Sequence, residues 1–214
     1  MKAIKATCFL VTIIAVLLSF FIYPHLPGTV PIHWNAFGDI DGYGPSWVEA
    51  FLFPAIMAFM LLLFVIIPKI EVFQKNINAF QRQYWLLCLS LQSFFLVLFA
   101  LTLSPNFGYR FNLSQLVALP FGMLFISIGV LLPSFKRNFF AGIRTPWALA
   151  NDEVWRKTHE FGGKAFILAG FATLISAPFP KAVFLVLIAA IMIAAIASVV
   201  YSYIEFKKHK KIRL

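Results

Sequence analysis

The chain has 214 residues, 61% of them hydrophobic, and its 18 Lys and Arg residues against 8 Asp and Glu residues give a formal net charge of +10. A mean hydropathy of +0.87 and 26 phenylalanines exclude an ordinary soluble domain, whose surface needs far more polar residues. At roughly 20 residues per span, the length suffices for about six membrane-spanning helices with short loops. We therefore expect an all-α fold, a polytopic membrane helix bundle without a large soluble domain.

Six apolar runs are long enough to be read as spans: residues 6–23, 47–67, 84–103, 115–132, 161–177 and 181–203. The first follows Lys2 and Lys5 and so also fits a signal peptide, but its end, FIYPHLPG, offers no small-residue cleavage site. An uncleaved span is favoured. We expect a two-span unit over residues 1–83 and a four-span unit over residues 84–214, the latter with a cytoplasmic amphipathic loop at 134–163.

The basic residues predict the orientation of these spans. If the N-terminus lies inside, 16 of the 18 Lys and Arg residues fall on the inner side, and only Arg110 and Lys181 fall outside. Lys and Arg retained on the cytoplasmic side set the orientation of membrane proteins, so both termini are expected in the cytoplasm. The basic ending EFKKHKKIRL then lies beside anionic lipid headgroups. Membrane lipid explains the net charge, and no direct nucleic-acid partner is needed.

Nothing in the sequence predicts a cofactor, a metal or a catalytic site. Cys8 and Cys88 both lie within apolar runs, where cysteine acts as a small buried hydrophobe. The histidines and aspartates of residues 24–47 match no metal-ligand spacing, and residues 137–164 hold no nucleophile with a matching base. We expect a protein that is not an enzyme.

Residues 24–47, which we call the outer loop, read PHLPGTVPIHWNAFGDIDGYGPSW. The loop has four prolines and four glycines and no Lys or Arg, which predicts a folded, turn-rich loop. Trp34 and Trp47 fit either interfacial anchors or binding residues. Glu49, just beyond the loop, is an acid at the outer end of a span. It either has a partner or a role there, or simply favours the helix N-terminus.

Residues 137–164, which we call the charged segment, read RNFFAGIRTPWALANDEVWRKTHEFGGK and hold eight charged residues. Thr145 can cap a helix that begins at Pro146. Helical spacing then places Trp147 and Val154 on an apolar face and His159 on a polar face, which predicts an amphipathic helix on the inner membrane surface, ending near residues 162–163. The guanidinium of Arg144 suits a lipid phosphate, a carboxylate or neighbouring helix ends.

These motifs carry a family resemblance. GIRTPWALANDEVWRKTHEFGGK closely resembles the signature of the SdpI-like family, the Sdp-type toxin-immunity membrane proteins of bacteria, and LPGTVPIHWNAFGDIDGYG is similar to the N-terminal domain that accompanies it. The ending VYSYIEFKKHKK is also similar, so the resemblance covers essentially the whole chain. The matched positions inside are Gly142, Arg144, Thr145, Pro146, Trp147, Val154, Trp155 and His159. Outside they are Pro27, Pro31, His33, Trp34 and Gly38, and the family offers no catalytic residue to carry over.

The resemblance implies a multi-pass protein of the bacterial cytoplasmic membrane that protects its producer from a secreted membrane-active peptide toxin. In the best understood setting such a protein is also a receptor that holds a cytoplasmic repressor protein at the membrane when toxin is bound. The alternative is a small transporter or exporter, for which the spans offer few polar residues, Gln92 being the clearest. A membrane enzyme would have only His33 with Asp39 or Asp41 to use.

Overall fold

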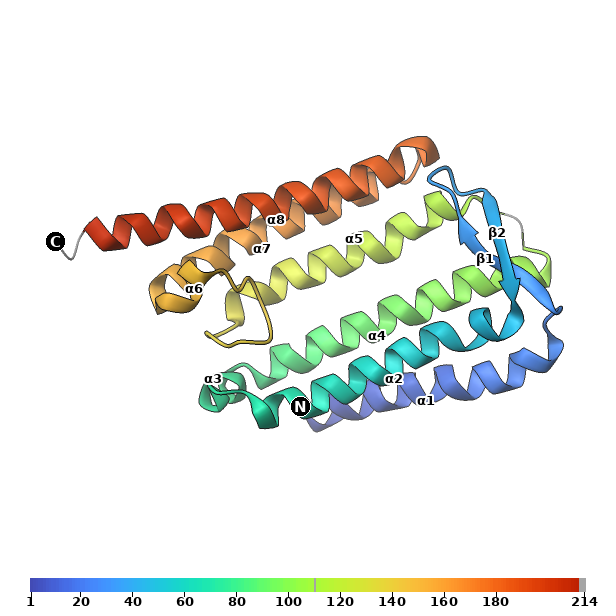
Figure 1. Cartoon of the computed structure of the whole chain (residues 1–214), viewed down its shortest axis with the longest axis horizontal. Helices are drawn as coiled ribbons and strands as arrows, with labels where there is room; N and C mark the ends of the chain where they lie inside the picture. Colours follow the sequence, from blue (N-terminus) through green and yellow to red (C-terminus); the bar gives the residue numbers. More distant parts are fainter. Residues whose placement is uncertain (110, 212–214) are drawn as a thin grey trace.

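The computed structural model describes residues 1–109 and 111–211, with side chains through Lys208. Its main body is a bundle of long helices: α1 (Lys2–Ile22), α2 (Ser46–Ile70), α4 (Gln81–Leu103), α5 (Leu113–Leu131), α7 (Asp152–Ser176) and α8 (Pro180–Lys211) (Figure 1). Short helices join them: α3 (Gln74–Ala79), α6 (Pro146–Ala150), and the 3-10 turns η1 (Tyr23–His25), η2 (Ser104–Phe107) and η3 (Leu132–Ser134). The all-α fold is confirmed.

Among the described residues, five helices are long and apolar enough to cross a membrane, namely those that contain α1, α2, α4, α5 and α8. The sixth expected span, 161–177, corresponds to the second part of α7, which ends at Ser176. The first turns of this helix are charged and lower its mean hydropathy. Both described chain ends lie at the same end of the bundle, with α3 and α6, which we call the terminal end (Figure 1). The chain therefore traverses the bundle an even number of times, and α7 supplies the sixth pass. Arg110 and Arg213, which enter the charge count, lie outside the described residues.

Glycines let α7 pack closely against α5. A Cβ added at Gly129 of α5 would lie 2.5 Å from the carbonyl oxygen of Gly163, and one added at Gly170 of α7 would lie 2.6 Å from the carbonyl oxygen of Gly122. Small residues at matching positions bring two helix backbones together, which strengthens dispersion contacts inside a membrane. This packing holds α7 in the bundle although it is the least apolar of the long helices.

The expected surface helix ending near residues 162–163 is wrong. The Asn151 side chain accepts hydrogen bonds from the backbone N–H groups of Glu153 and Val154, at 2.8 and 3.1 Å, so it ends α6 and begins a new helix. That helix, α7, continues unbroken past Gly162 and Gly163. The two glycines do not terminate it because they are buried in packing contacts with α8, α5 and the preceding loop.

The outer loop is folded as predicted, but it contains strands that the sequence did not suggest. Strands β1 (Thr29–Trp34) and β2 (Ile40–Pro45) form an antiparallel hairpin with a register irregularity around His33. Prolines and glycines, which are common here, are depleted in ordinary strands. The hairpin lies across the bundle at the end opposite the termini, which we call the hairpin end (Figure 1).

Candidate functional site

At the terminal end, the charged segment folds around His159. This side chain is fully buried, and its Nε2 accepts a hydrogen bond of 3.0 Å from the N–H of Ile143, while Nδ1 lies 2.8 Å from the carbonyl oxygen of Trp155. Because Nε2 is an acceptor, Nδ1 must carry the proton that the carbonyl receives, and the ring is neutral. Gly142, at φ +111°, lies directly against the ring, and any Cβ there would collide with Nε2. The expected solvated position of His159 is therefore wrong.

Burial accounts for the protonation state of this ring. Desolvation lowers the pKa of His159 to about 4, and the hydrogen bond to Trp155 opposes that shift only in part. The indole of Trp155 stacks on the imidazole with ring centroids 4.1 Å apart. Protonation would turn Nε2 into a donor facing the Ile143 N–H. The neutral ring thus locks the loop before α6 onto α7.

The remaining aromatic and hydroxyl groups of the segment join it to its neighbours. Trp155 Nε1 donates a 2.7 Å hydrogen bond to the carbonyl oxygen of Phe135. Thr145 caps α6 as predicted, accepting from the N–H of Ala148 at 3.1 Å, and its hydroxyl also bonds that of Ser202 on α8. The ring of Trp147 packs against Tyr203 of α8, 5.0 Å between centroids. The segment is therefore a brace between the end of α5 and the last turns of α8.

The other three predicted residues of this segment differ in exposure. Val154 is fully buried, whereas Pro146, the first residue of α6, is exposed. Arg144 is also exposed, and its Nη1 donates to the carbonyl oxygen of Phe139 at 2.7 Å. Arg144 is thus the predicted residue of this segment best placed to meet a partner.

Two buried residues that sequence reasoning missed complete the brace. The carboxylate of Glu71, 2% exposed, accepts hydrogen bonds from the N–H groups of Phe73 and Phe139 at 2.9 and 3.0 Å. The Asn138 side chain is fully buried and bonds four backbone groups of its own loop. Glu71 joins segments 68 residues apart. No local pattern in the sequence signals such a pairing.

At the hairpin end, the tip of the hairpin is attached to the start of α5, which in turn bonds the start of α8. Asn112 Nδ2 donates to the carbonyl oxygen of Phe37 at 2.7 Å, and the Ser114 hydroxyl lies 3.3 Å from the carbonyl oxygen of Ala36 and 3.0 Å from that of Pro180. Gly38 has φ +86°, and a Cβ there would lie 2.5 Å from Asn112 Oδ1. Glycine at this position is what lets the tip approach the start of α5.

The other predicted residues of the outer loop lie along the hairpin and before it. Pro27 precedes β1 and is exposed, whereas Pro31, within β1, is buried. His33 Nδ1 lies 2.5 Å from Asp41 Oδ1, and both side chains are substantially exposed, at 69% and 43%. Trp34 is half-buried at the end of β1. The structure thus brings His33 and Asp41 together as a surface pair.

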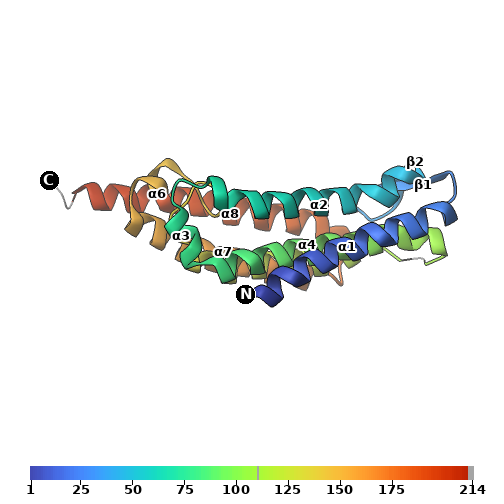
Figure 2. The same cartoon turned by 90° about the horizontal axis from the view of Figure 1, so that it is seen from below.

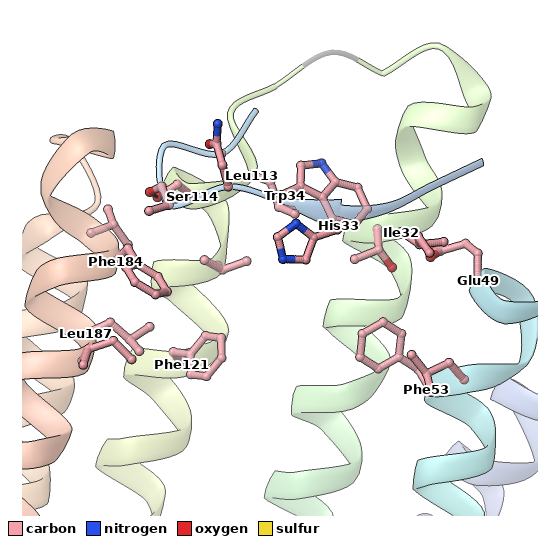
Figure 3. A pocket seen from close by; sticks show the side chains of 18 of the residues that line it. Ile32, His33, Trp34, Glu49, Phe53, Leu113, Ser114, Phe121, Phe184 and Leu187 are labelled. Atoms are coloured by element: carbon pink, nitrogen blue, oxygen red, sulfur yellow. Dashed lines mark hydrogen bonds between the residues drawn. The ribbon is translucent and has the colours of Figure 1, made fainter. Parts of the chain in front are cut away.

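Beneath the hairpin lies a cavity of about 500 Å³, a size typical of small-ligand sites. Residues of the hairpin and of α2, α4, α5 and α8 line it. Figure 3 shows side chains facing one another across it under the strand that carries Ile32, His33 and Trp34, with Glu49 and Phe53 from α2 on one side and Phe121, Phe184 and Leu187 from α5 and α8 on the other. Among the predicted residues, His33, Trp34, Gly38 and Glu49 meet at this cavity.

Glu49 is the acidic residue of this cavity. It lies in the first turn of α2, is 4% exposed, and its Oε1 has no hydrogen-bond partner among the described residues. A buried carboxylate oxygen without a partner is costly, and such groups in native proteins commonly mark a binding role. Most of the remaining wall is apolar. The arrangement can receive an apolar molecule that offers a hydrogen-bond donor or a positive charge.

Comparison with known proteins agrees with the sequence motifs. Residues 134–202 match the SdpI/YfhL protein family, and residues 10–58 match a domain of unknown function, DUF1648. The chain is 27% identical over 212 residues to the immunity protein SdpI of Bacillus subtilis (strain 168). The aligned region covers 93% of this chain and 96% of that protein. No solved structure matches.

The two matched segments correspond to the two ends just described. The first includes the hairpin and Glu49, and the second includes α6, α7 and most of α8. Similarity to the relative extends across both and through the helices between them. The chain is a multi-pass membrane protein that resembles the SdpI/YfhL family over residues 134–202 and is similar to the immunity protein SdpI along most of its length.

Proposed function

We propose that this protein is a membrane immunity protein that protects the cell producing it from a secreted membrane-active peptide toxin. The observation that carries this proposal is the similarity to an immunity protein over 93% of the chain. The protein is placed in the bacterial cytoplasmic membrane, with the terminal end inside, where its many Lys and Arg residues meet anionic lipid. The hairpin end then faces outward, towards a secreted peptide.

Toxin sensing is the finer part of the proposal. The hairpin bonds directly to the start of α5, and Ser114 of α5 bonds the start of α8. Helix α8 then reaches the brace through Ser202 and Tyr203. A toxin that moves the hairpin therefore has a continuous packed path to the terminal end. There the exposed Arg144 guanidinium is available to a cytoplasmic repressor protein, with no direct contact between this chain and nucleic acid.

Immunity is tested in toxin-sensitive bacteria that express this chain and are challenged with an Sdp-type peptide toxin. Survival and membrane potential should be preserved relative to cells carrying an empty vector. A membrane protein of similar length expressed to the same level controls for nonspecific effects. Collapse of the membrane potential despite full expression would rule immunity out.

Sensing is tested with Arg144→Ala and a reporter of repressor release. The variant should still protect, because Arg144 makes one side-chain hydrogen bond and comes just before α6, which lies at the opposite end of the bundle from the hairpin (Figure 1). Toxin should no longer induce the reporter. Lys136→Ala is the matched control, since Lys136 is an exposed basic residue of the same loop region. Unchanged induction in Arg144→Ala would sink the proposed role of Arg144.

Transport is the competing function, and its main support in the sequence is Gln92. In the structure this residue has another role. Gln92 is buried at 1% exposure, donates to the carbonyl oxygen of Met57 at 2.9 Å and accepts from the Thr12 hydroxyl at 3.1 Å. It joins α1, α2 and α4 to one another. Both polar atoms of Gln92 are therefore engaged within the bundle, which supports a structural role for this residue.

A further inference from the structure

The cavity beneath the hairpin is open to the lipid side of the bundle. Leu52 of α2 and Phe184 and Ile188 of α8 line it and are 49%, 53% and 44% exposed. In Figure 2, α2 and α8 lie at the upper face of the bundle, and Figure 1 shows α4 and α5 between them. An apolar molecule dissolved in the membrane can therefore enter the cavity between α2 and α8.

Polar and apolar groups are ordered by depth in this cavity. Glu49 lies in the first turn of α2, next to the hairpin, whereas Phe53 lies one turn deeper, and Phe121 and Leu187 face the same space from α5 and α8 (Figure 3). An amphiphile in a membrane has the same order, with its charged group near the interface and its apolar part below.

The charge at the hairpin end favours a positively charged ligand. The outer loop has no Lys or Arg, and its Asp39 and Asp41 together with Glu49 outnumber the two basic residues, Arg110 and Lys181, that the sequence predicts on this side. The rest of the chain is strongly basic. A cation is therefore attracted to this end, and an ammonium group at Glu49 Oε1 would supply the hydrogen bonds that this oxygen lacks.

We infer that the cavity binds an apolar peptide segment that carries a primary ammonium group, an amino terminus or a lysine, with the ammonium on Glu49 and the apolar side chains between α2, α5 and α8. A zwitterionic aminolipid offers the same ammonium, but its phosphate would lie close to the Glu49 carboxylate and be repelled. The ligand class stands on the cavity alone. Only its identification with the toxin rests on the proposed function.

The test measures binding to the full-length protein in phosphatidylcholine nanodiscs by titration calorimetry, with empty nanodiscs as the blank. The probes are phenylalanyl-leucine amide with a free amino terminus and its N-acetylated form, which differ in the ammonium group. The free amine should bind wild type roughly tenfold more tightly, as a charge-assisted hydrogen bond in an apolar site implies. Equal affinities for the two probes would overturn the inference.

Variants assign the preference to Glu49. Glu49→Gln should abolish the difference between the probes, whereas Asp39→Asn, which removes the same charge at the same end but outside the cavity, should keep it. Val117→Phe, which narrows the cavity but keeps the carboxylate, should weaken both probes alike. An amine preference that survives in Glu49→Gln would place the cation elsewhere and refute the assignment.

Two further experiments distinguish a peptide ligand from an aminolipid, and the proposed binding site from the proposed immunity function. Phosphatidylethanolamine added to the nanodiscs should leave amine binding unchanged, and displacement by this lipid would assign the cavity to an aminolipid against our inference. Selective amine binding by a chain that gives no protection would remove immunity but keep the site. Protection without amine selectivity would do the reverse.

Discussion

The two ends of the bundle differ in how their buried acidic residues are satisfied. At the terminal end, His159, Glu71 and Asn138 are buried, and hydrogen bonds to backbone groups satisfy each of them. At the hairpin end, Glu49 is equally buried, yet its Oε1 has no partner among the described residues and lies beside a cavity. Satisfied buried groups specify one rigid conformation, whereas an unsatisfied one is retained at a cost in stability.

Because of this difference, the most recognisable motif of the sequence and the candidate ligand site lie at opposite ends of the bundle. The charged segment is the most distinctive motif of the sequence, and most of its predicted side chains serve to hold the segment together. The outer loop is a weaker motif, but it closes the cavity next to Glu49, whose Oε1 has no hydrogen-bond partner among the described residues. We conclude that the terminal end is built to stay in one arrangement, and that the hairpin end is built to accept another molecule.

The largest expected effect comes from Gly142→Ala, which attacks the rigid end directly. Alanine would be strained at φ +111°. Its Cβ would also displace the His159 ring, whose Nε2 accepts a hydrogen bond from the Ile143 N–H. We expect the free energy of unfolding to fall by about 3 to 4 kcal/mol. Thermal unfolding of the purified protein in detergent measures it.

Gly108→Ala is the matched control for this substitution. Gly108 also has positive φ, +84°, but a Cβ there meets nothing within 4 Å. It should cost only about 1 kcal/mol, the backbone strain alone. If the two variants lost equal stability, contact with the His159 ring would contribute nothing and the brace would not depend on it.

The next effect is a loss of stability in acid. The folded pKa of His159, about 4, lies below its ordinary value of 6.5, so the unfolded chain binds the extra proton first. This contribution to stability is complete above pH 6.5 and declines as the pH falls from 6.5 to 4, by up to about 3 kcal/mol. Thermal unfolding measured across that range should show the decline.

His159→Gln is the control, because an amide does not titrate and its oxygen can still accept from the Ile143 N–H. The variant should be less stable than wild type at pH 7.5, but its stability should vary less between pH 6.5 and 4. Parallel curves of stability against pH for the two proteins would show that acid destabilises the fold through other groups. The proposed stabilising role of the neutral His159 ring would then be refuted.

The sequence predicts what depends on neighbouring residues. Apolar length predicts the long helices, and the Thr145–Pro146 pair predicts the start of α6, because both signals are local. The hairpin is missed because Pro31 and the loop glycines oppose strand propensity, and the tertiary bonds of Asn112 and Ser114 override it. His159 is misplaced because its burial depends on Gly142, which lies 17 residues earlier in the sequence.

Glu49 shows the same limit for the candidate site. The sequence marks it as an acid near a span end, which fits either a binding role or a favourable helix terminus. Its burial and missing partner depend on how α2, α4 and the hairpin meet, and no stretch of residues encodes that directly.

The smallest expected effect, Glu49→Leu, has the opposite sign and sharpens the contrast between the two ends. Replacing an unsatisfied buried carboxylate by an apolar side chain of similar size should raise the free energy of unfolding by about 1 kcal/mol while ligand binding is lost. Gln92→Leu, which removes a satisfied buried group, should instead lower it. Thermal unfolding of both variants in the same detergent decides the matter. A clear destabilisation by Glu49→Leu would mean that the carboxylate supports the fold as the buried groups of the brace do, and the two ends would then not differ in kind.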